Sequence, residues 1–208
     1  MTSVTTRWWW LRHAPVINHG GVIYGNSEVD CDVSNVSDFR SLAARLPEDA
    51  VWVTSNLGRT RKTAAAIAAA SDRSEPEQLV ESHLAEQNFG AWQGRTLAEI
   101  EIAGEAAQHR FWLTPAAHTP PGGESFVAVV ERVSGVVERL NRVHAGRDIV
   151  TVTHGGTIRA ALAIALGLDP AAVLAFQIET LSLTRIDHIS DRNHGDDWRV
   201  VGVNLPVS

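Results

Sequence analysis

The sequence predicts an α/β protein with three α/β/α layers, in which helices cover both faces of a mainly parallel sheet. Short, nearly continuous apolar runs alternate along the chain with helix-like stretches, as in repeated strand–helix–strand units. The 208 residues are 44% apolar, which is enough for a sizeable core. Polar or cationic residues follow three of the apolar runs, where open sheets of this class bind their ligands.

The first part of the chain shows the alternation clearly. Residues 7–11, which include three successive tryptophans, form a predicted strand. Residues 33–46 carry apolar side chains at helical spacing, and Pro47 then ends that helix. The next predicted elements are a strand over 51–54, a helix over 59–70 and a short strand over 78–80.

Residues 84–121 interrupt the alternation. They are rich in Gln, Glu and Ala, with helical patterns over 97–102 and 105–113. We interpret them as an insertion that covers the site, within a single domain of residues 1–208. The remaining predicted elements are a long helix over 124–144, a helix over 158–166, and strands over 149–152, 181–186 and 198–203.

Composition limits the functions that we consider. The formal charge is −6, from 18 Lys and Arg against 24 Asp and Glu, so we expect no nucleic-acid partner and no membrane partner. The single cysteine, Cys31, excludes an internal disulfide and a CxxC metal site and indicates a reducing compartment. No signal-like segment or membrane span of about 18 apolar residues occurs. We expect a cytoplasmic protein, either a monomer or a homodimer.

Three strand ends carry candidate ligand-binding residues. They are Arg12 and His13 after the first strand, Ser55 and Arg59 after the second, and His154 with two glycines after the strand over 149–152. A lone Arg-His pair is weak evidence, since strand ends often carry a solvated arginine or a structural histidine. Three such junctions at one edge of a sheet favour an anion-binding site. The other histidines lack ligand spacing, so we expect no metal.

Five motifs occur in a fixed order along the chain. They are Leu-Arg-His at 11–13, Ser55 with Arg59-Thr60 and Thr63-Ala64, Glu86 with Phe-Gly-Ala-Trp-Gln-Gly at 89–94, Pro-Gly-Gly-Glu-Ser at 121–125, and Thr-His-Gly-Gly at 153–156 with Ile158-Arg159. Together they resemble the histidine phosphatase superfamily, the phosphoglycerate-mutase-like group. The segments at 89–94 and 122–125 look most like α-ribazole phosphatase and the broad-specificity phosphatases.

The resemblance implies a metal-independent phosphomonoesterase without a cofactor, acting on a small phosphorylated metabolite, such as α-ribazole 5'-phosphate. It assigns His13 as the nucleophile that becomes phosphohistidine. Glu86 is the implied general acid, which protonates the leaving alkoxide and then activates water. Arg12 and Arg59 are the implied phosphate ligands, because guanidinium groups can bind phosphate in a bidentate fashion.

The other implied site residues surround this group. His154 is expected to donate to the phosphoryl oxygens, helped by the amides of Gly155 and Gly156 at a helix N-terminus. Glu124 and Ser125 are explained equally well as the start of a helix. Candidates for contact with the rest of the substrate are Asn18, Tyr24 and Trp112.

Three features near the nucleophile depart from the family pattern. Ala14 stands where glycine is usual, and its methyl group is tolerated if its φ angle is negative. Pro15 and Val16 replace a polar pair that often supplies a hydroxyl to the phosphate. Asn18 lies one residue before the position of the family's phosphate-contacting asparagine, which His19 occupies.

These departures leave alternatives to the phosphatase. A cofactor-dependent phosphoglycerate mutase would use the same residues, and a catalytically silent binding module would keep only the fold. A phosphohistidine-protein phosphatase fits less well, because those relatives are smaller and lack much of the insertion at 84–121. The segment over 86–94 resembles the phosphatases more than the mutases, so the phosphatase is the favoured hypothesis.

Overall fold

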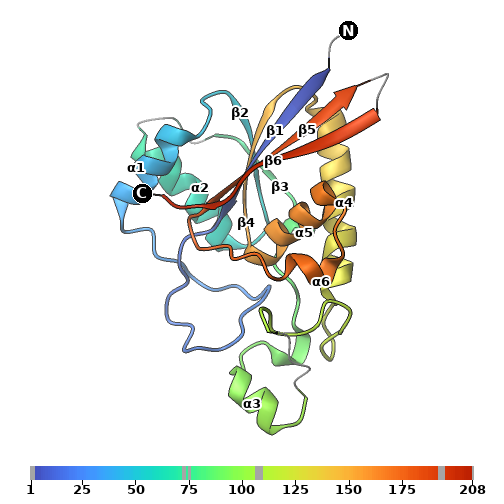
Figure 1. Ribbon diagram of the computed structural model, residues 1–208. Helices are drawn as coiled ribbons and strands as arrows, with labels where there is room; N and C mark the ends of the chain where they lie inside the picture. The colour runs from blue at the N-terminus through green and yellow to red at the C-terminus, as the bar shows by residue number, and fades with distance from the viewer. Residues whose placement is uncertain (1–2, 72–73, 75, 106–109, 192–194, 208) are drawn as a thin grey trace.

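The centre of the molecule is a six-stranded sheet (Figure 1). The computed structural model describes residues 3–71, 74, 76–105, 110–191 and 195–207. The strands are β1 (Val4–Arg12), β2 (Ala50–Thr54), β3 (Gln78–Val80), β4 (Asp148–Thr153), β5 (Leu183–Asp191) and β6 (Gly195–Leu205). Their order is β3-β2-β4-β1-β5-β6. The first four strands in this order are parallel to one another. β5 pairs antiparallel with β1, and β6 pairs antiparallel with β5. The mainly parallel sheet is therefore confirmed.

Helices cover both faces of the sheet (Figure 1). They are α1 (Val36–Arg45), α2 (Gly58–Ala70), α3 (Leu97–Ile102), α4 (Phe126–Val143), α5 (Gly155–Leu166) and α6 (Pro170–Val173), with short 3-10 turns at Ser82–Leu84 and Gly90–Trp92. The helix α4 begins two residues later than predicted because the Ser125 side chain caps it by accepting from the amide of Ala128.

The prediction of a helix over 105–113 is wrong for residues 105 and 110–113, which are not helical. The other four residues of that range, 106–109, lie outside the described residues. The backbone over 110–113 forms turns and bends rather than a helix. Glu105 lies just after α3, where its carboxylate accepts from Arg95 at 2.9 Å and from the Trp92 indole at 3.2 Å. These tertiary contacts outweigh the local helical preference of the segment.

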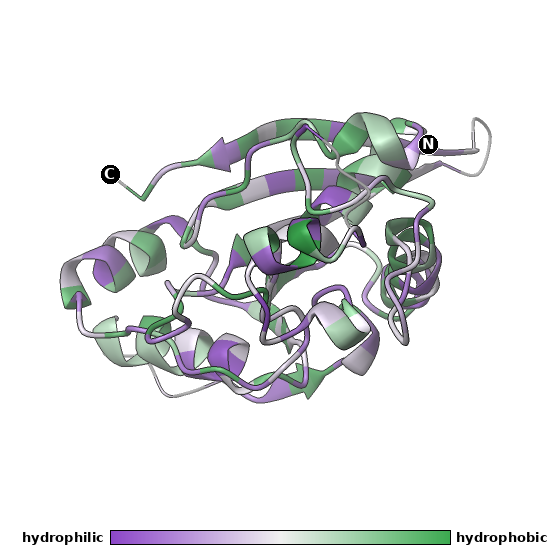
Figure 2. Ribbon diagram, turned by 90° about the horizontal axis from the view of Figure 1, so that it is seen from below, coloured by the Kyte–Doolittle hydropathy of each residue, from purple (hydrophilic) through white to green (hydrophobic). Residues whose placement is uncertain are grey.

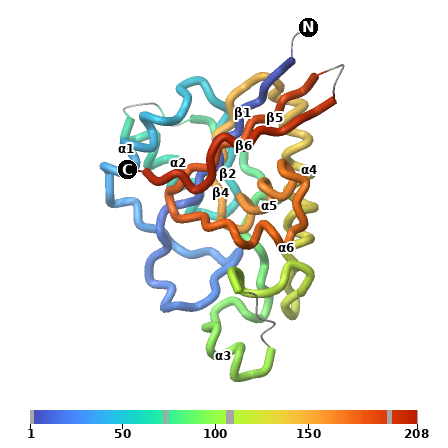
Figure 3. The backbone as a smooth tube through the Cα atoms, viewed as in Figure 1, coloured from blue at the N-terminus to red at the C-terminus, as the bar shows by residue number. Residues whose placement is uncertain are grey.

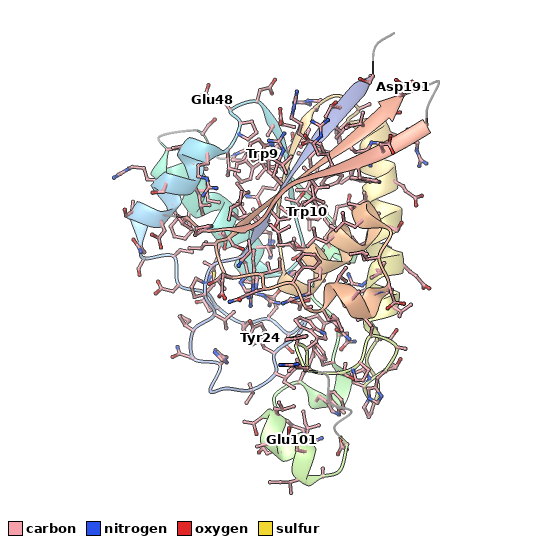
Figure 4. All side chains as sticks on the ribbon, in the orientation of Figure 1. Trp9, Trp10, Tyr24, Glu48, Glu101 and Asp191 are labelled. Atoms are coloured by element: carbon pink, nitrogen blue, oxygen red, sulfur yellow. The ribbon has the colours of Figure 1, made fainter. Side chains whose placement is uncertain are left out.

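The three tryptophans of β1 connect the two apolar layers. Trp8 and Trp10 point to the same face, and their rings stack with centroids 4.8 Å apart in the core beneath α4 and α5. Trp9 points to the opposite face, beside the cluster that α1 and α2 cover, and Figure 4 labels it together with Trp10. This alternation is the period of two expected of a strand, and it confirms the three-layer arrangement.

The two antiparallel strands form one side of the sheet. Both are longer than predicted, and hydrophilic and hydrophobic residues alternate along them (Figure 2). Exposed and half-buried residues alternate over part of the edge strand β6, whereas the first six residues of β5 are buried apart from the half-buried Arg185. Among the described residues, no helix is both long and apolar enough to cross a membrane.

Two long connections meet beyond the carboxyl ends of the parallel strands. The loop after β1 and the segment around α3 lie side by side there (Figure 3), joined by a β-bridge between Val22 and Thr96. The carbonyl oxygen of Ile23 accepts from the amide of Gly94 at 2.8 Å. These connections form the walls of the site described next.

Candidate active site

His13 and His154 lie next to each other because of the strand register. Arg12 of β1 pairs with Thr153 of β4, so the residues that follow the two strands are neighbours. The centroids of the two imidazole rings are 5.1 Å apart, and both side chains are almost fully buried. The two catalytic histidines implied by the family pattern therefore meet at one point of the sheet edge.

The hydrogen bonds of His13 define its reactive atom. Its Nδ1 lies 2.7 Å from the carbonyl oxygen of Ala14, which can only accept, so Nδ1 carries the proton. The lone pair is then on Nε2, and Nε of Arg59 donates to it at 3.3 Å. Burial, followed by the positive charge of Arg59, lowers the pKa of His13 to about 3. His13 is therefore a neutral imidazole at physiological pH, as nucleophilic attack requires.

Arg59 fixes the loop after β1 against the nucleophile. Its side chain is fully buried, and its two terminal nitrogens donate to the carbonyls of Ser27 at 2.8 Å and Gly25 at 2.7 Å. Its Cζ also lies 5.3 Å from the centre of the Tyr24 ring. Since three of its five N–H groups are engaged within the protein, Arg59 is held rigidly beside His13.

His154 is held by a residue for which no contact with a histidine was predicted. Its Nε2 lies 2.8 Å from the hydroxyl of Ser55, at the end of β2. Its Nδ1 is buried, with no hydrogen-bond partner in the described part of the chain. Burial, followed by the charges of His13 and Arg59, lowers the pKa of His154 well below its ordinary value. The position of Ser55 after a strand in the motif was the only signal of this contact.

The side chain of Arg12 lies beside Gly155, the first residue of α5. Nη1 of Arg12 donates to the carbonyl of Ile178 at 2.6 Å, while its Nε is buried without a partner among the described residues. A Cβ atom on Gly155 would stand 3.7 Å from that Nε and 3.1 Å from Nη1 of Arg159. The absence of a side chain at Gly155 thus lets two guanidinium groups approach the same point.

The carboxylate of Glu86 accepts a hydrogen bond from the amide of Gly156, which the resemblance assigns to phosphate. Its two carboxylate oxygens lie 3.1 and 3.3 Å from the amide nitrogen of Gly156, which donates to them. A Cβ atom on Gly156 would overlap Oε1 of Glu86, so only glycine permits this approach. The carboxylate of Glu86 therefore lies at the N-terminus of α5 and lines the same cavity as Arg12.

An arginine of α4 that sequence reasoning missed supports the backbone around Glu86. Arg132 donates to the carbonyls of His83 at 2.6 Å and Glu86 at 3.3 Å. It also forms a two-point ion pair with Glu124, at 2.9 and 3.0 Å. Glu124 in turn accepts from the amide of Asn88 at 2.9 Å. These contacts agree with the interpretation of Glu124 as part of a helix start rather than a substrate ligand.

A cavity of about 550 Å³ adjoins these groups, and Arg12 and Glu86 both line it. We call His13, Arg12, Arg59 and His154 the phosphate floor, and the cavity-lining residues 21–25, 86, 89, 97 and 110–113 the outer wall. Tyr24 and Trp112 belong to the outer wall, and Figure 4 shows Tyr24 between the strand ends and α3. The Trp112 indole donates to Oε1 of Gln87 at 3.0 Å. Asn18 does not line the cavity: it is exposed, with a φ of 55°.

The unusual Ala14 is compatible with the site. The described non-glycine residues with positive φ are Asn18, Leu181 and Asn204, so Ala14 has a negative φ. Its side chain is buried in the apolar cluster beneath α1 and α2, and its amide donates to the hydroxyl of Thr63 at 2.9 Å. The methyl group therefore packs into the core. In the described chain, no group of three or more His, Cys, Asp or Glu residues is placed to hold a metal ion.

Comparison with known proteins agrees with this geometry. The model of the histidine phosphatase superfamily (branch 1) matches residues 8–204. A glucosyl-3-phosphoglycerate phosphatase of Mycolicibacterium vanbaalenii is 30% identical over 76% of this chain and 76% of its own length. An adenosylcobalamin/alpha-ribazole phosphatase of Escherichia coli is 26% identical over 87% of this chain and 89% of its own.

The chain also resembles part of a longer protein and a protein of known structure. A bifunctional protein of Mycobacterium tuberculosis is 32% identical over 68% of this chain, which matches only 38% of that protein's length. The structure of a mycobacterial glucosyl-3-phosphoglycerate phosphatase superposes with a TM-score of 0.81 at 26% identity, covering 97% of this chain and 99% of the other. The chain belongs to the histidine phosphatase superfamily, among relatives that are named as phosphatases.

Proposed function

We propose that the protein is a metal-independent phosphomonoesterase that hydrolyses a small phosphorylated metabolite through a phosphohistidine on His13. One observation carries this proposal: the unprotonated Nε2 of His13 is buried beside Arg59, with Arg12 and His154 at the same sheet edge. Phosphoryl transfer requires mainly positioning and positive charge around the phosphoryl oxygens, and the phosphate floor supplies both.

The reaction has two steps. In the first, Nε2 of His13 forms a bond to phosphorus as the ester P–O bond breaks, and Glu86 in its protonated form gives its proton to the leaving alkoxide. In the second, the Glu86 carboxylate takes a proton from water, the oxygen of which bonds to phosphorus as the N–P bond breaks. Arg12, Arg59 and His154 stabilise the charge on the phosphoryl oxygens in both steps.

The test is rapid-quench mixing of the protein with p-nitrophenyl phosphate in EDTA. Intact-mass measurement of the wild type should show one added phosphoryl group that is stable to base and lost in acid, together with release of inorganic phosphate. His13→Gln should show neither, with hydrolysis reduced about 10⁴-fold or more. Hydrolysis that EDTA abolishes, or a phosphoenzyme that persists in His13→Gln, would contradict the proposal.

The second candidate is a bisphosphoglycerate-dependent phosphoglycerate mutase. A relative of that name from Methylobacterium radiotolerans is 31% identical over 75% of this chain. A mutase must protect its phosphoenzyme from water, so its decay should be slow until 3-phosphoglycerate is added. Fast spontaneous decay to inorganic phosphate would support the phosphatase. A panel that includes α-ribazole 5'-phosphate would then rank the substrates, while no phosphoenzyme with any of them would indicate a silent module.

A further inference from the structure

The motif over 89–94 contains a glutamine, Gln93, to which the proposed reaction gives no role. It lies in the insertion and is half-buried. Its Oε1 accepts hydrogen bonds from the amides of Phe89 at 3.3 Å and Asn26 at 3.0 Å. Its Nε2 lies 3.0 Å from the hydroxyl of Ser27, to which it donates. The side chain of Gln93 therefore joins the insertion to the loop after β1.

The close approach of Gln93 to this loop requires a glycine. A Cβ atom on Gly25 would overlap Oε1 of Gln93 and would stand 2.8 Å from the carbonyl oxygen of Gln87. Gly25 also has a φ of 46°, which a residue with a side chain adopts only with strain. Any other residue at this position would therefore displace Gln93 or change the path of the loop.

Gln93 and Arg59 bind opposite ends of one peptide group. Its amide, that of Asn26, donates to Gln93, and its carbonyl, that of Gly25, accepts from Nη2 of Arg59 at 2.7 Å. Because a trans peptide group is planar and its N–H and C=O point in opposite directions, Gln93 fixes the direction of the carbonyl that Arg59 uses. Ser27, which Gln93 binds through the hydroxyl, offers its own carbonyl to Nη1 of Arg59 at 2.8 Å.

Arg59 in turn contacts His13, the proposed nucleophile. Its Nε donates to Nε2 of His13 at 3.3 Å, and its side chain is fully buried. In such a closely packed place the guanidinium can turn only if the two carbonyls that accept from it move. The loop has a further tie, since the carboxylate of Glu28 accepts from the amide of Gly58 at 3.0 Å. Loss of the Gln93 side chain should therefore loosen the loop rather than release it.

We infer that Gln93 is a positioning residue that acts through Arg59 on the phosphoryl group. This inference rests on the proposed function, in which Arg59 binds the phosphoryl oxygens. Gln93 belongs to the insertion, which supplies much of the outer wall, but its effect should fall on the phosphate floor. Its loss should therefore lower activity equally for every leaving group, whereas a residue that only shapes the outer wall should affect substrates unequally.

The test is a double-mutant cycle between Gln93 and Arg59. Gln93→Met keeps the volume but removes all three hydrogen bonds, so kcat/KM should fall about tenfold for both p-nitrophenyl phosphate and O-phosphoethanolamine. In the Arg59→Gln background the same change should lower kcat/KM less than about twofold, because the group that Gln93 positions is already gone. Gln93→Glu keeps the acceptor oxygens, and the Ser27 hydroxyl can turn to donate to them, so kcat/KM should stay within about threefold of the wild type.

Thr96→Ala is the matched control. It removes the side-chain cap of α3 in the same insertion, where Oγ1 of Thr96 accepts from the amide of Glu99 at 3.3 Å, and kcat/KM should stay within about threefold. A tenfold loss in Thr96→Ala would mean that any loosening of the insertion lowers activity. Losses that add in the double variant would show that Gln93 acts independently of Arg59, and a loss confined to one substrate would assign Gln93 to the outer wall. Each of these results overturns the inference.

Calorimetric titration with inorganic phosphate repeats the cycle without catalysis. Gln93→Met should weaken phosphate binding about tenfold by itself and less than about twofold beside Arg59→Gln. If Gln93→Met does not fold, Ser27→Ala removes one of the three hydrogen bonds and should show a smaller loss that again disappears beside Arg59→Gln.

The two proposals fail in different ways. An active wild type in which Gln93→Met changes neither kcat/KM nor phosphate binding would overturn the inference and leave the proposed phosphatase function standing. Absence of hydrolysis and of a phosphoenzyme in the wild type would overturn that function, and the phosphate titration would still decide whether Gln93 acts through Arg59. A wild type that neither reacts with phosphate esters nor binds phosphate would overturn both.

Discussion

The phosphate floor and the outer wall of the cavity are built in different ways. His13, Arg59 and His154 follow strands of the parallel sheet or begin a helix, and each is 1% exposed or less. The outer wall comes from two long connections, and residues such as Phe111, 53% exposed, reach the solvent. The sheet thus fixes the residues that we propose bind phosphate, while the connections supply most of the rest of the cavity lining.

Glu86 is an exception to this separation, because it belongs to the outer wall but is expected to take part in the reaction. Glu86→Gln should reduce kcat about 10²- to 10⁴-fold for an alkyl phosphate, the leaving group of which needs a proton. With p-nitrophenyl phosphate the loss in phosphoenzyme formation should be much smaller, because p-nitrophenolate leaves without protonation. Rapid-quench measurement of that step for both substrates checks the prediction.

The leaving-group dependence is what identifies Glu86 as an acid. An equal loss of the first step with both substrates would instead make it a positioning residue for the N-terminus of α5. Glu124→Gln serves as the control, because Glu124 supports the same segment through Arg132 and has no role in proton transfer. It should lower both rates by a similar factor.

The same division explains what the sequence could predict. Arg12 ends β1, and His13 and His154 directly follow strands. Parallel strand register brings such positions together, so their convergence was predictable. Arg132 acts from a helix far along the chain, and nothing local marks it. The helix expected over 105–113 failed where Glu105 is used for tertiary contacts. The roles of Arg132 and Glu105 depend on packing between distant segments, which local sequence patterns do not encode.

The pKa of His13 gives a prediction about folding. The unfolded chain binds a proton at His13 with a pKa near 6.5, whereas the folded chain does so only near 3. Between these values the unfolded state binds more protons, so the stability of the protein rises with pH and is lost as the pH falls. One such group changes the free energy of unfolding by about 1.4 kcal/mol per pH unit. His13→Gln should therefore flatten the pH dependence by about that amount.

Urea unfolding at pH values from 6 to 4, in buffers free of phosphate, checks this slope. His154 contributes in the same direction in both proteins, since its pKa is also lowered, so part of the dependence should remain. A slope that is identical in the wild type and His13→Gln would show that His13 is not kept neutral by the fold.

Ser55 tests the rigidity of the phosphate floor. Ser55→Ala removes the hydroxyl 2.8 Å from Nε2 of His154, so that the orientation of this buried imidazole is less firmly fixed. Because His154 is proposed to contact the phosphoryl group common to all substrates, kcat/KM should fall about tenfold for every substrate alike. Ser55→Thr keeps the hydroxyl and should recover part of the activity. A loss that depends on the leaving group would contradict the role of Ser55 as a support of His154 in the phosphate floor.

Gln87 is the corresponding support of the outer wall, and its replacement should have the smallest effect. Its side chain joins the Trp112 indole, at 3.0 Å, to the carbonyl of Glu124, at 2.9 Å. Gln87→Met keeps the volume but removes both hydrogen bonds, so Trp112 should hold its position less firmly. We expect KM to rise about threefold for p-nitrophenyl phosphate, which presents a ring to Trp112, and to stay unchanged for phosphoethanolamine. An equal change for both would mean that Trp112 supports the phosphate floor as well, and the separation between the two regions would then fail.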